Sequence, residues 1–131
     1  MLAVLGLMFL GFDPSVLTIP PEMMVVPELP KEWTRDDVRN YAIEIAKEYG
    51  LKTQKFLDVI KCENNFEAKG QSNHYYKGVR ENSWGVAQFH NPETDWNMTI
   101  EEAENPEIAL PKMAQAWLDG LAPRWSCWHP G

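Results

Sequence analysis

The stretch IKCENNF (residues 60–66) closes a predicted helix on an unexpected residue. The preceding run, TQKFLDVIK, predicts a short amphipathic helix whose apolar side chains recur at Phe56, Val59 and Ile60. Glu63 is the next member of that apolar stripe. A carboxyl group at the end of a buried helix face is costly to ionise, so its pKa should rise. Glu63 is therefore either a protonated acid beside a cleft or a residue at which the chain simply turns to solvent.

The chain on the N-terminal side of this stretch predicts another helix. Thr34 provides an N-cap with an acidic first turn, Gly50 provides a stop, and Thr53 is expected to cap the helix that ends near Glu63. Beyond that helix, residues 67–98 carry no sustained period and predict a loop region with a small sheet or hairpin. The first helix has an apolar stripe formed by Val38, Tyr41, Ala42, Ile45, Ala46 and Tyr49.

Helical signals return after this irregular middle. Thr99 and Glu102 form a predicted capping box, and Asn105–Pro106 is typical of an N-cap followed by proline at the first helical position. We expect a kink or a restart at Pro111. The predicted stripe of this last helix consists of Leu110, Ala114, Trp117, Leu118 and Leu121. The sequence thus predicts a mostly α, single-core domain with a long polar middle.

Composition narrows the classes of function. The 131 residues support one domain, and 44% hydrophobic residues are enough for a core. A net charge of -7 argues against nucleic acid as a partner and gives an anionic polymer no long-range attraction, so local contacts must capture such a polymer. The three histidines form no metal-ligand pattern, and we expect no metal or other cofactor; they are His74, His90 and His129.

The N-terminal quarter, residues 1–33, is compositionally distinct. Residues 1–12 are apolar but shorter than the ~20 residues that a membrane-spanning helix needs. They favour a degenerate export signal or the remnant of an anchor that associates with a membrane; the alternative is an element packed on the domain. The proline-rich segment 13–33 predicts a linker or strap, followed by a folded domain over residues 34–131.

The segment ENNFEAKGQSNHYYKGVRENSWGVAQ (residues 63–88) resembles the signature of the soluble lytic transglycosylase and goose-type lysozyme superfamily. Glu63 stands at the position of the catalytic acid, Asn64 replaces the usual serine, and Phe66 stands at the aromatic position. Ser72 matches a later serine, and Gly85–Gln88 matches a Gly-Leu-Met-Gln-like turn preceded by Ser83. The resemblance extends over residues 34–128 and implies an α+β, lysozyme-like fold with a glycan cleft.

The resemblance also implies roles for single residues. Glu63 would cleave the bond between N-acetylmuramic acid and N-acetylglucosamine, acting first as acid and then as base to close a 1,6-anhydro ring. Phe66 would screen this acid from water, and Gly85 would let the backbone approach the glycan closely. The remaining candidates for substrate contacts are Ser72, Ser83, Gln88, Tyr75, Tyr76 and Trp84. Either tyrosine would supply the hydroxyl of an Ala-Tyr-Asn motif that is missing here; Trp96 and Trp125 are also free to line a cleft, whereas Trp117 belongs to the core.

Two alternatives remain open on the sequence. The first is a hydrolytic muramidase in which Glu81 or Asp95 positions water, because ordinary glycosidases use a second carboxylate. The second is a wall-binding module without activity, which the replacement at Asn64 keeps open. The resemblance further implies a Cys62–Cys127 disulfide in an exported, monomeric protein; cysteine count alone leaves two reduced thiols equally possible.

Overall fold

The computed structural model describes residues 31–130, and from Glu32 onward these residues belong to one compact unit. The predictions for residues 1–12, and for the linker up to residue 30, lie outside the described residues. Of the helices in the described range, none has both the length and the apolarity that a membrane span requires.

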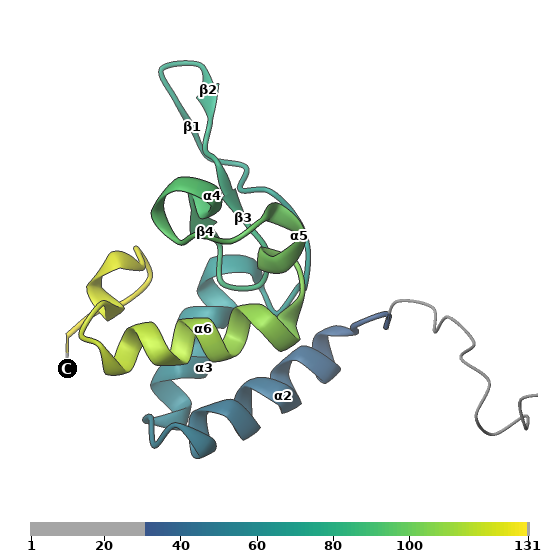
Figure 1. The fold of residues 1–131 in the computed structure, drawn as a ribbon, viewed down its shortest axis with the longest axis vertical. Helices are drawn as coiled ribbons and strands as arrows, with labels where there is room; N and C mark the ends of the chain where they lie inside the picture. The colour runs from purple at the N-terminus through teal and green to yellow at the C-terminus, as the bar shows by residue number, and fades with distance from the viewer. Residues whose placement is uncertain (1–30, 131) are drawn as a thin grey trace, which may run out of the picture. The chain divides into compact units, whose positions relative to one another are not determined.

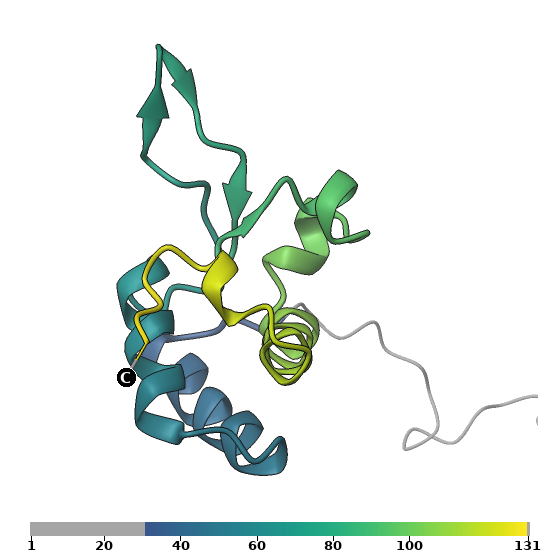
Figure 2. The same cartoon turned by 90° about the vertical axis from the view of Figure 1, so that its left-hand side faces the viewer.

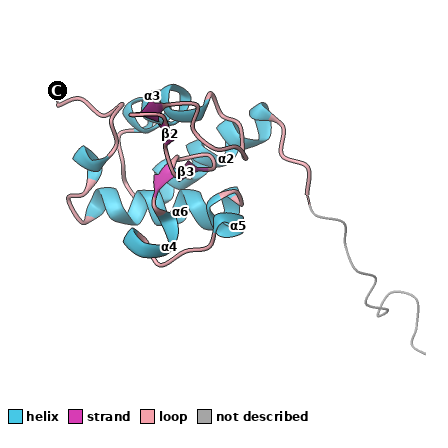
Figure 3. Ribbon diagram, turned by 90° about the horizontal axis from the view of Figure 1, so that it is seen from above, coloured by secondary structure: helices cyan, strands magenta, loops and turns pink. Residues whose placement is uncertain are grey.

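Helices account for about half of the described residues, and the chain between α3 and α4 forms two small antiparallel sheets. Figure 3 shows the helices in cyan and the short strands in magenta. The prediction of a mostly α domain with a small β region is therefore confirmed. Three longer helices form its base: α2 (Arg35–Glu48), α3 (Thr53–Asn64) and α6 (Pro106–Leu118), with α2 in contact with both others (Figure 1). The largest fully buried side chains of the core are Phe56, Phe89, Ile60, Leu110, Met113, Val38 and Val86.

The helix boundaries follow local capping signals. The Thr34 hydroxyl accepts a hydrogen bond from the Asp37 N–H at 3.0 Å, and Asp37 accepts one from the Thr34 N–H at 3.1 Å. After α2, Gly50 adopts a φ of +70°, as the predicted stop requires. The prediction of Thr53 as a cap is wrong by one residue: Lys52 is the N-cap of α3, without a side-chain hydrogen bond, and Thr53 is the first helical residue.

The irregular middle forms two hairpins of two-residue strands. The first pairs β1 (Tyr75–Tyr76) with β2 (Val79–Arg80), and the second pairs β3 (Ser83–Trp84) with β4 (Phe89–His90). The β3–β4 hairpin packs on the core, whereas β1–β2 extends away from the helices (Figures 1 and 2). A short helix that was not predicted, α4 (Pro92–Asp95), follows β4.

The C-terminal helices confirm both predicted caps. The Thr99–Glu102 capping box precedes α5 (Ile100–Ala103), and Asn105 caps α6, with proline at its first position. The helix does not restart at Pro111 but runs continuously to Leu118. Leu118, predicted to be part of the apolar stripe, is 53% exposed because it lies in the last turn of α6, where the core ends. The 3-10 helix η3 (Ala122–Arg124) then leads into the tail.

Candidate active site

An open cleft of about 920 Å³ lies between two parts of the chain. We call the end of α3 together with the tail the helix wall; its lining residues are Cys62, Glu63, Arg124, Trp125, Ser126 and Cys127. The other lining residues, from the hairpins and α4, form the hairpin wall: Ser72, His74, Glu81, Ser83, Gln88, Phe89, His90, Asp95 and Trp96. The cleft thus brings together six predicted site residues, namely Glu63, Ser72, Ser83, Gln88, Cys62 and Cys127.

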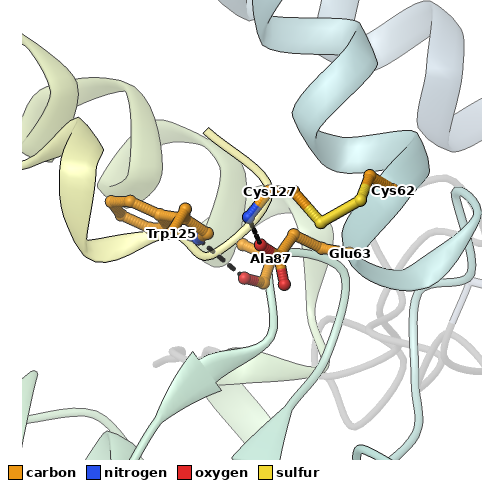
Figure 4. Close-up of a disulfide and its surroundings, with 5 residues drawn as sticks. All are labelled: Cys62, Glu63, Ala87, Trp125 and Cys127. Atoms are coloured by element: carbon orange, nitrogen blue, oxygen red, sulfur yellow. Dashed lines mark hydrogen bonds between the residues drawn. A yellow bond between two sulfur atoms is a disulfide. The ribbon is translucent and has the colours of Figure 1, made fainter. Parts of the chain in front are cut away.

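Glu63 lies in the last turn of α3, partly buried, and its carboxylate accepts a hydrogen bond from the Cys127 N–H at 3.1 Å (Figure 4). Burial raises the pKa of Glu63, because the charged form loses water, and the negative charge of Glu81 raises it further. The Cys127 N–H, the Ser126 hydroxyl and His74 oppose this rise without cancelling it. The apolar stripe of α3 therefore ends on a carboxyl group that retains its proton to higher pH than an ordinary glutamate does.

A disulfide joins Cys62, next to this acid, to Cys127 in the tail, across a separation of 65 residues (Figure 4). The pairing that the resemblance implied is confirmed. The tail is anchored a second time by the buried Trp125, whose indole N–H donates to the Ala87 carbonyl at 2.8 Å. These two attachments fix the tail over the end of α3, which is how a backbone N–H reaches Glu63. The disulfide is typical of an oxidising, exported environment.

The Asn64 side chain has a structural role as a hydrogen-bond donor to the backbone. Its side-chain NH₂ group lies within hydrogen-bond distance of three carbonyl oxygens, at 3.2 Å from Glu67, 3.1 Å from Lys69 and 3.1 Å from Gly85. A serine hydroxyl has one donor hydrogen on a shorter side chain and cannot replace this clamp. The asparagine therefore ties the loop after the acid to the β3–β4 turn, a reason for its presence that does not require contact with a substrate.

The hairpin wall is built around the Glu81 carboxylate. The Ser72 hydroxyl donates to this carboxylate at 2.8 Å and accepts from the His74 N–H at 3.1 Å. His90 Nδ1 lies 3.6 Å from the other Glu81 oxygen and 3.0 Å from the Ser83 hydroxyl. Ser72 and Ser83, which we expected to face the sugar, are both buried and hold Glu81 and His90 in place.

Gly85 and Gln88 also have partners within the protein. A Cβ at Gly85, whose φ is +84°, would overlap the Ala103 carbonyl, so glycine is needed here for the β3–β4 turn to pack on α5. The Gln88 amide NH₂ donates to the carbonyls of Gly70, at 3.1 Å, and Gly85, at 2.8 Å. Gln88 still lines the cleft, whereas Gly85 does not.

Besides Gly85, four predicted site residues lie outside the cleft lining. Phe66 packs against the core in a left-handed backbone conformation with a φ of +61°. The Trp84 indole N–H donates to the Asn82 side chain at 2.6 Å. Tyr75 and Tyr76 are 65% and 76% exposed on the β1–β2 hairpin, and neither supplies a hydroxyl to the cleft.

Sequence reasoning missed several lining residues. Trp96 and Trp125, which we expected to be free for a cleft, do line it, but Phe89 was not anticipated. Ser126 and Arg124 depend on the return of the tail, for which no local pattern exists. The Arg124 guanidinium lies 5.4 Å from the centroid of the Trp96 ring.

The side chains that line the cleft are suited to proton transfer. Three carboxyl groups, Glu63, Glu81 and Asp95, share it with one arginine and two histidines. Within residues 31–130, no group of three or more His, Cys, Asp or Glu side chains is placed to hold a metal ion.

In comparisons with known proteins, no family model, curated protein or solved structure matches this chain. By its geometry alone, the chain is a mostly α, disulfide-braced protein with an acid-bearing cleft.

Proposed function

We propose that this protein is an exported lytic transglycosylase that cleaves peptidoglycan between N-acetylmuramic acid and N-acetylglucosamine, on a lysozyme-like fold. The observation that carries the proposal is the Glu63 carboxyl group, partly buried in an open cleft and with a raised pKa. Protonation of the glycosidic oxygen assists its departure, and a carboxyl group with a raised pKa can supply that proton. The resemblance of residues 63–88 to the superfamily signature supports the same residue.

The chemistry would proceed in two steps at Glu63. The carboxyl group donates its proton to the glycosidic oxygen, the bond to C1 of the muramoyl sugar breaks, and the acetamido group of that sugar shelters the cation. The Glu63 carboxylate then accepts the proton of the C6 hydroxyl while the C6 oxygen bonds to C1, which gives a 1,6-anhydro product. The Cys127 N–H and the Ser126 hydroxyl would stabilise the carboxylate between these steps.

A hydrolytic muramidase is the second candidate, and one observation favours it. Glu81 lines the same cleft as Glu63 and is oriented by the Ser72 hydroxyl. Most glycosidases use two carboxyl groups that flank the bond to be cleaved. Glu81 would be the second of these and would activate a water molecule in place of the C6 hydroxyl. Mass spectrometry of products from purified peptidoglycan separates the two, because a transglycosylase leaves anhydro ends and a hydrolase leaves hydrated reducing ends.

The decisive variant is Glu63→Gln, which keeps the shape of the side chain but removes the transferable proton. We expect product release to fall by about 10²–10⁴-fold. Glu93→Gln is the matched control, because Glu93 is an exposed carboxylate that does not line the cleft. Unchanged turnover in Glu63→Gln would refute both enzymatic candidates; wall binding without any turnover in the wild type would indicate a non-catalytic module.

Glu81→Gln distinguishes the two enzymes independently of product analysis. A hydrolase that uses Glu81 as base should lose about 10²-fold or more in rate. A transglycosylase should keep its anhydro products and most of its rate at its pH optimum, since no second carboxylate takes part.

A further inference from the structure

The β1–β2 hairpin is a short, well-anchored projection from the hairpin wall. Lys77 and Gly78 form its two-residue turn with φ values of +51° and +81°, the positive angles of a tight turn whose twist matches the paired strands. At its base, the Arg80 guanidinium donates to the Ser72 carbonyl at 2.7 Å and to the Asn73 side chain at 3.0 Å. The hairpin is therefore held in position although it extends away from the helices (Figures 1 and 2).

This hairpin exposes large apolar side chains that contribute little to the core. Tyr75 and Tyr76 are 65% and 76% exposed, and Val79 is 69% exposed. Pairing of Tyr76 with Val79 places these two side chains together on one side of the ribbon, and Tyr75 pairs with Arg80 on the other. Exposed aromatic residues gathered on a projection are typical of a binding surface.

Charge indicates the kind of partner. The segment Asn73–Arg80 carries Lys77 and Arg80 and no acidic residue, in a chain whose net charge is -7. The Lys77 ammonium lies 5.4 Å from the centroid of the Tyr76 ring. A basic, aromatic projection on an acidic protein suits a partner that offers both carboxylates and flat apolar ring faces.

The hairpin is also continuous with the cleft. Ser72 and His74, which precede β1, and Glu81, which follows β2, all line it. The part of a bound polymer that extends out of the cleft would therefore run past the base of the hairpin.

We propose that the β1–β2 hairpin is a binding arm for a carboxylate-bearing glycan strand, in which Tyr75 and Tyr76 each offer a ring for stacking on a sugar, one on either side of the ribbon, and Lys77 pairs with a carboxylate. The identification of this strand as peptidoglycan rests on the function proposed above. The arm gives the acidic protein the local contacts by which it captures an anionic polymer, and it makes the protein selective for long strands over short ones.

Binding to insoluble peptidoglycan, measured by co-sedimentation in the Glu63→Gln background, tests the arm without digesting the ligand. We expect Tyr75→Ala/Tyr76→Ala to raise the Kd about tenfold. Tyr75→Phe/Tyr76→Phe, which keeps the rings, should bind like its parent, as should Leu118→Ala, which removes an exposed apolar side chain of α6. Lys77→Glu leaves both rings in place and should weaken binding most at low salt. Circular dichroism of each variant checks folding.

Wild-type binding in Tyr75→Ala/Tyr76→Ala and in Lys77→Glu would overturn the arm. So would hairpin-dependent binding to anionic phosphatidylglycerol vesicles but not to peptidoglycan, which would indicate a membrane contact, or hairpin-dependent self-association on a sizing column. If the wild type releases no products and the hairpin variants still lose wall binding, the proposed activity fails while the arm stands. If the wild type is active, removing both rings should slow digestion of long strands about tenfold and leave a short oligosaccharide that fills only the cleft unaffected.

Discussion

The two walls of the cleft are stabilised in different ways. The helix wall is fixed by a disulfide, by the buried Trp125, whose indole N–H donates to the Ala87 carbonyl, and by the Cys127 N–H, which donates to the partly buried acid Glu63. The hairpin wall is held by side-chain hydrogen bonds around Glu81, and its β1–β2 extension is exposed. The acid with the raised pKa therefore lies on the wall that is braced covalently, and the exposed aromatic side chains lie on the extension of the other wall.

Removal of the disulfide should have the largest effect on stability. Because the bridge closes a loop of 65 residues, Cys62→Ser/Cys127→Ser should lose about 4 kcal/mol of unfolding free energy in urea denaturation. Reduction of the wild type should reproduce this loss, and reduction of the double variant should add nothing. A loss below about 1 kcal/mol would show that the helix wall does not depend on its covalent link.

Asn64→Ala tests the clamp between the loop after Glu63 and the β3–β4 turn and should have the next largest effect. Three carbonyl oxygens lose their side-chain donor, so we expect a loss of about 1–3 kcal/mol. Asn64→Ser should recover only part of it, because serine brings a single donor hydrogen. Asn40→Ala, at an exposed position of α2, is the control and should change stability by less than about 0.5 kcal/mol. Equal losses in both alanine variants would exclude the clamp.

Glu81→Gln tests whether the walls are coupled by charge. The negative charge of Glu81 contributes to the raised pKa of Glu63, second to burial among the causes that raise it, so the substitution should lower that pKa only in part. NMR titration of the Glu63 carboxyl carbon measures this without activity; in an active enzyme, the alkaline limb of the pH–rate profile should shift to lower pH. Glu93→Gln should leave the pKa of Glu63 unchanged. An unchanged or raised pKa of Glu63 in Glu81→Gln would contradict the coupling.

The smallest expected effect is the pH dependence of stability that Glu63 itself causes. Between the ordinary glutamate pKa of 4.5 and the raised value, the folded protein binds more protons at this site than the unfolded chain does. Stability from this group is therefore full below pH 4.5 and is lost as pH rises through the folded pKa. Glu63→Gln, which retains an oxygen acceptor for the Cys127 N–H, should remove this slope and be the more stable protein at pH 7. If the free energy of unfolding depends on pH in the same way in both proteins, burial does not raise the pKa of Glu63.

Much of the helical part could be predicted from sequence because its signals are local. The Thr34 and Thr99 capping boxes, the Asn105–Pro106 start and the apolar stripes each involve residues a few positions apart. The errors were also local: Thr53 is one residue inside its helix, and Leu118 keeps helical spacing but lies beyond the end of the core. A stripe predicts which face of a helix points inward but not how far the core extends along it.

The site was predictable only in part, because the surroundings of its residues are assembled from distant segments. Position on the stripe of α3 drew attention to Glu63, and a resemblance, rather than any spacing, suggested its disulfide. The tasks of Ser72, Ser83 and Gln88 inside the hairpin wall, and the absence of Tyr75 and Tyr76 from the cleft, follow from pairings of irregular segments that have no sequence period.

The sequence by itself determined where α2, α5 and α6 begin, and that one apolar stripe ends on a carboxyl group, since both follow from interactions within one or two turns of helix. Only the tertiary structure decided what surrounds that group. The return of the tail places the Cys127 N–H on Glu63, and the folded middle places Glu81 in the same cleft. The pKa of a carboxyl group depends on water, charge and donors within a few ångströms, and here those neighbours come from residues far away along the chain.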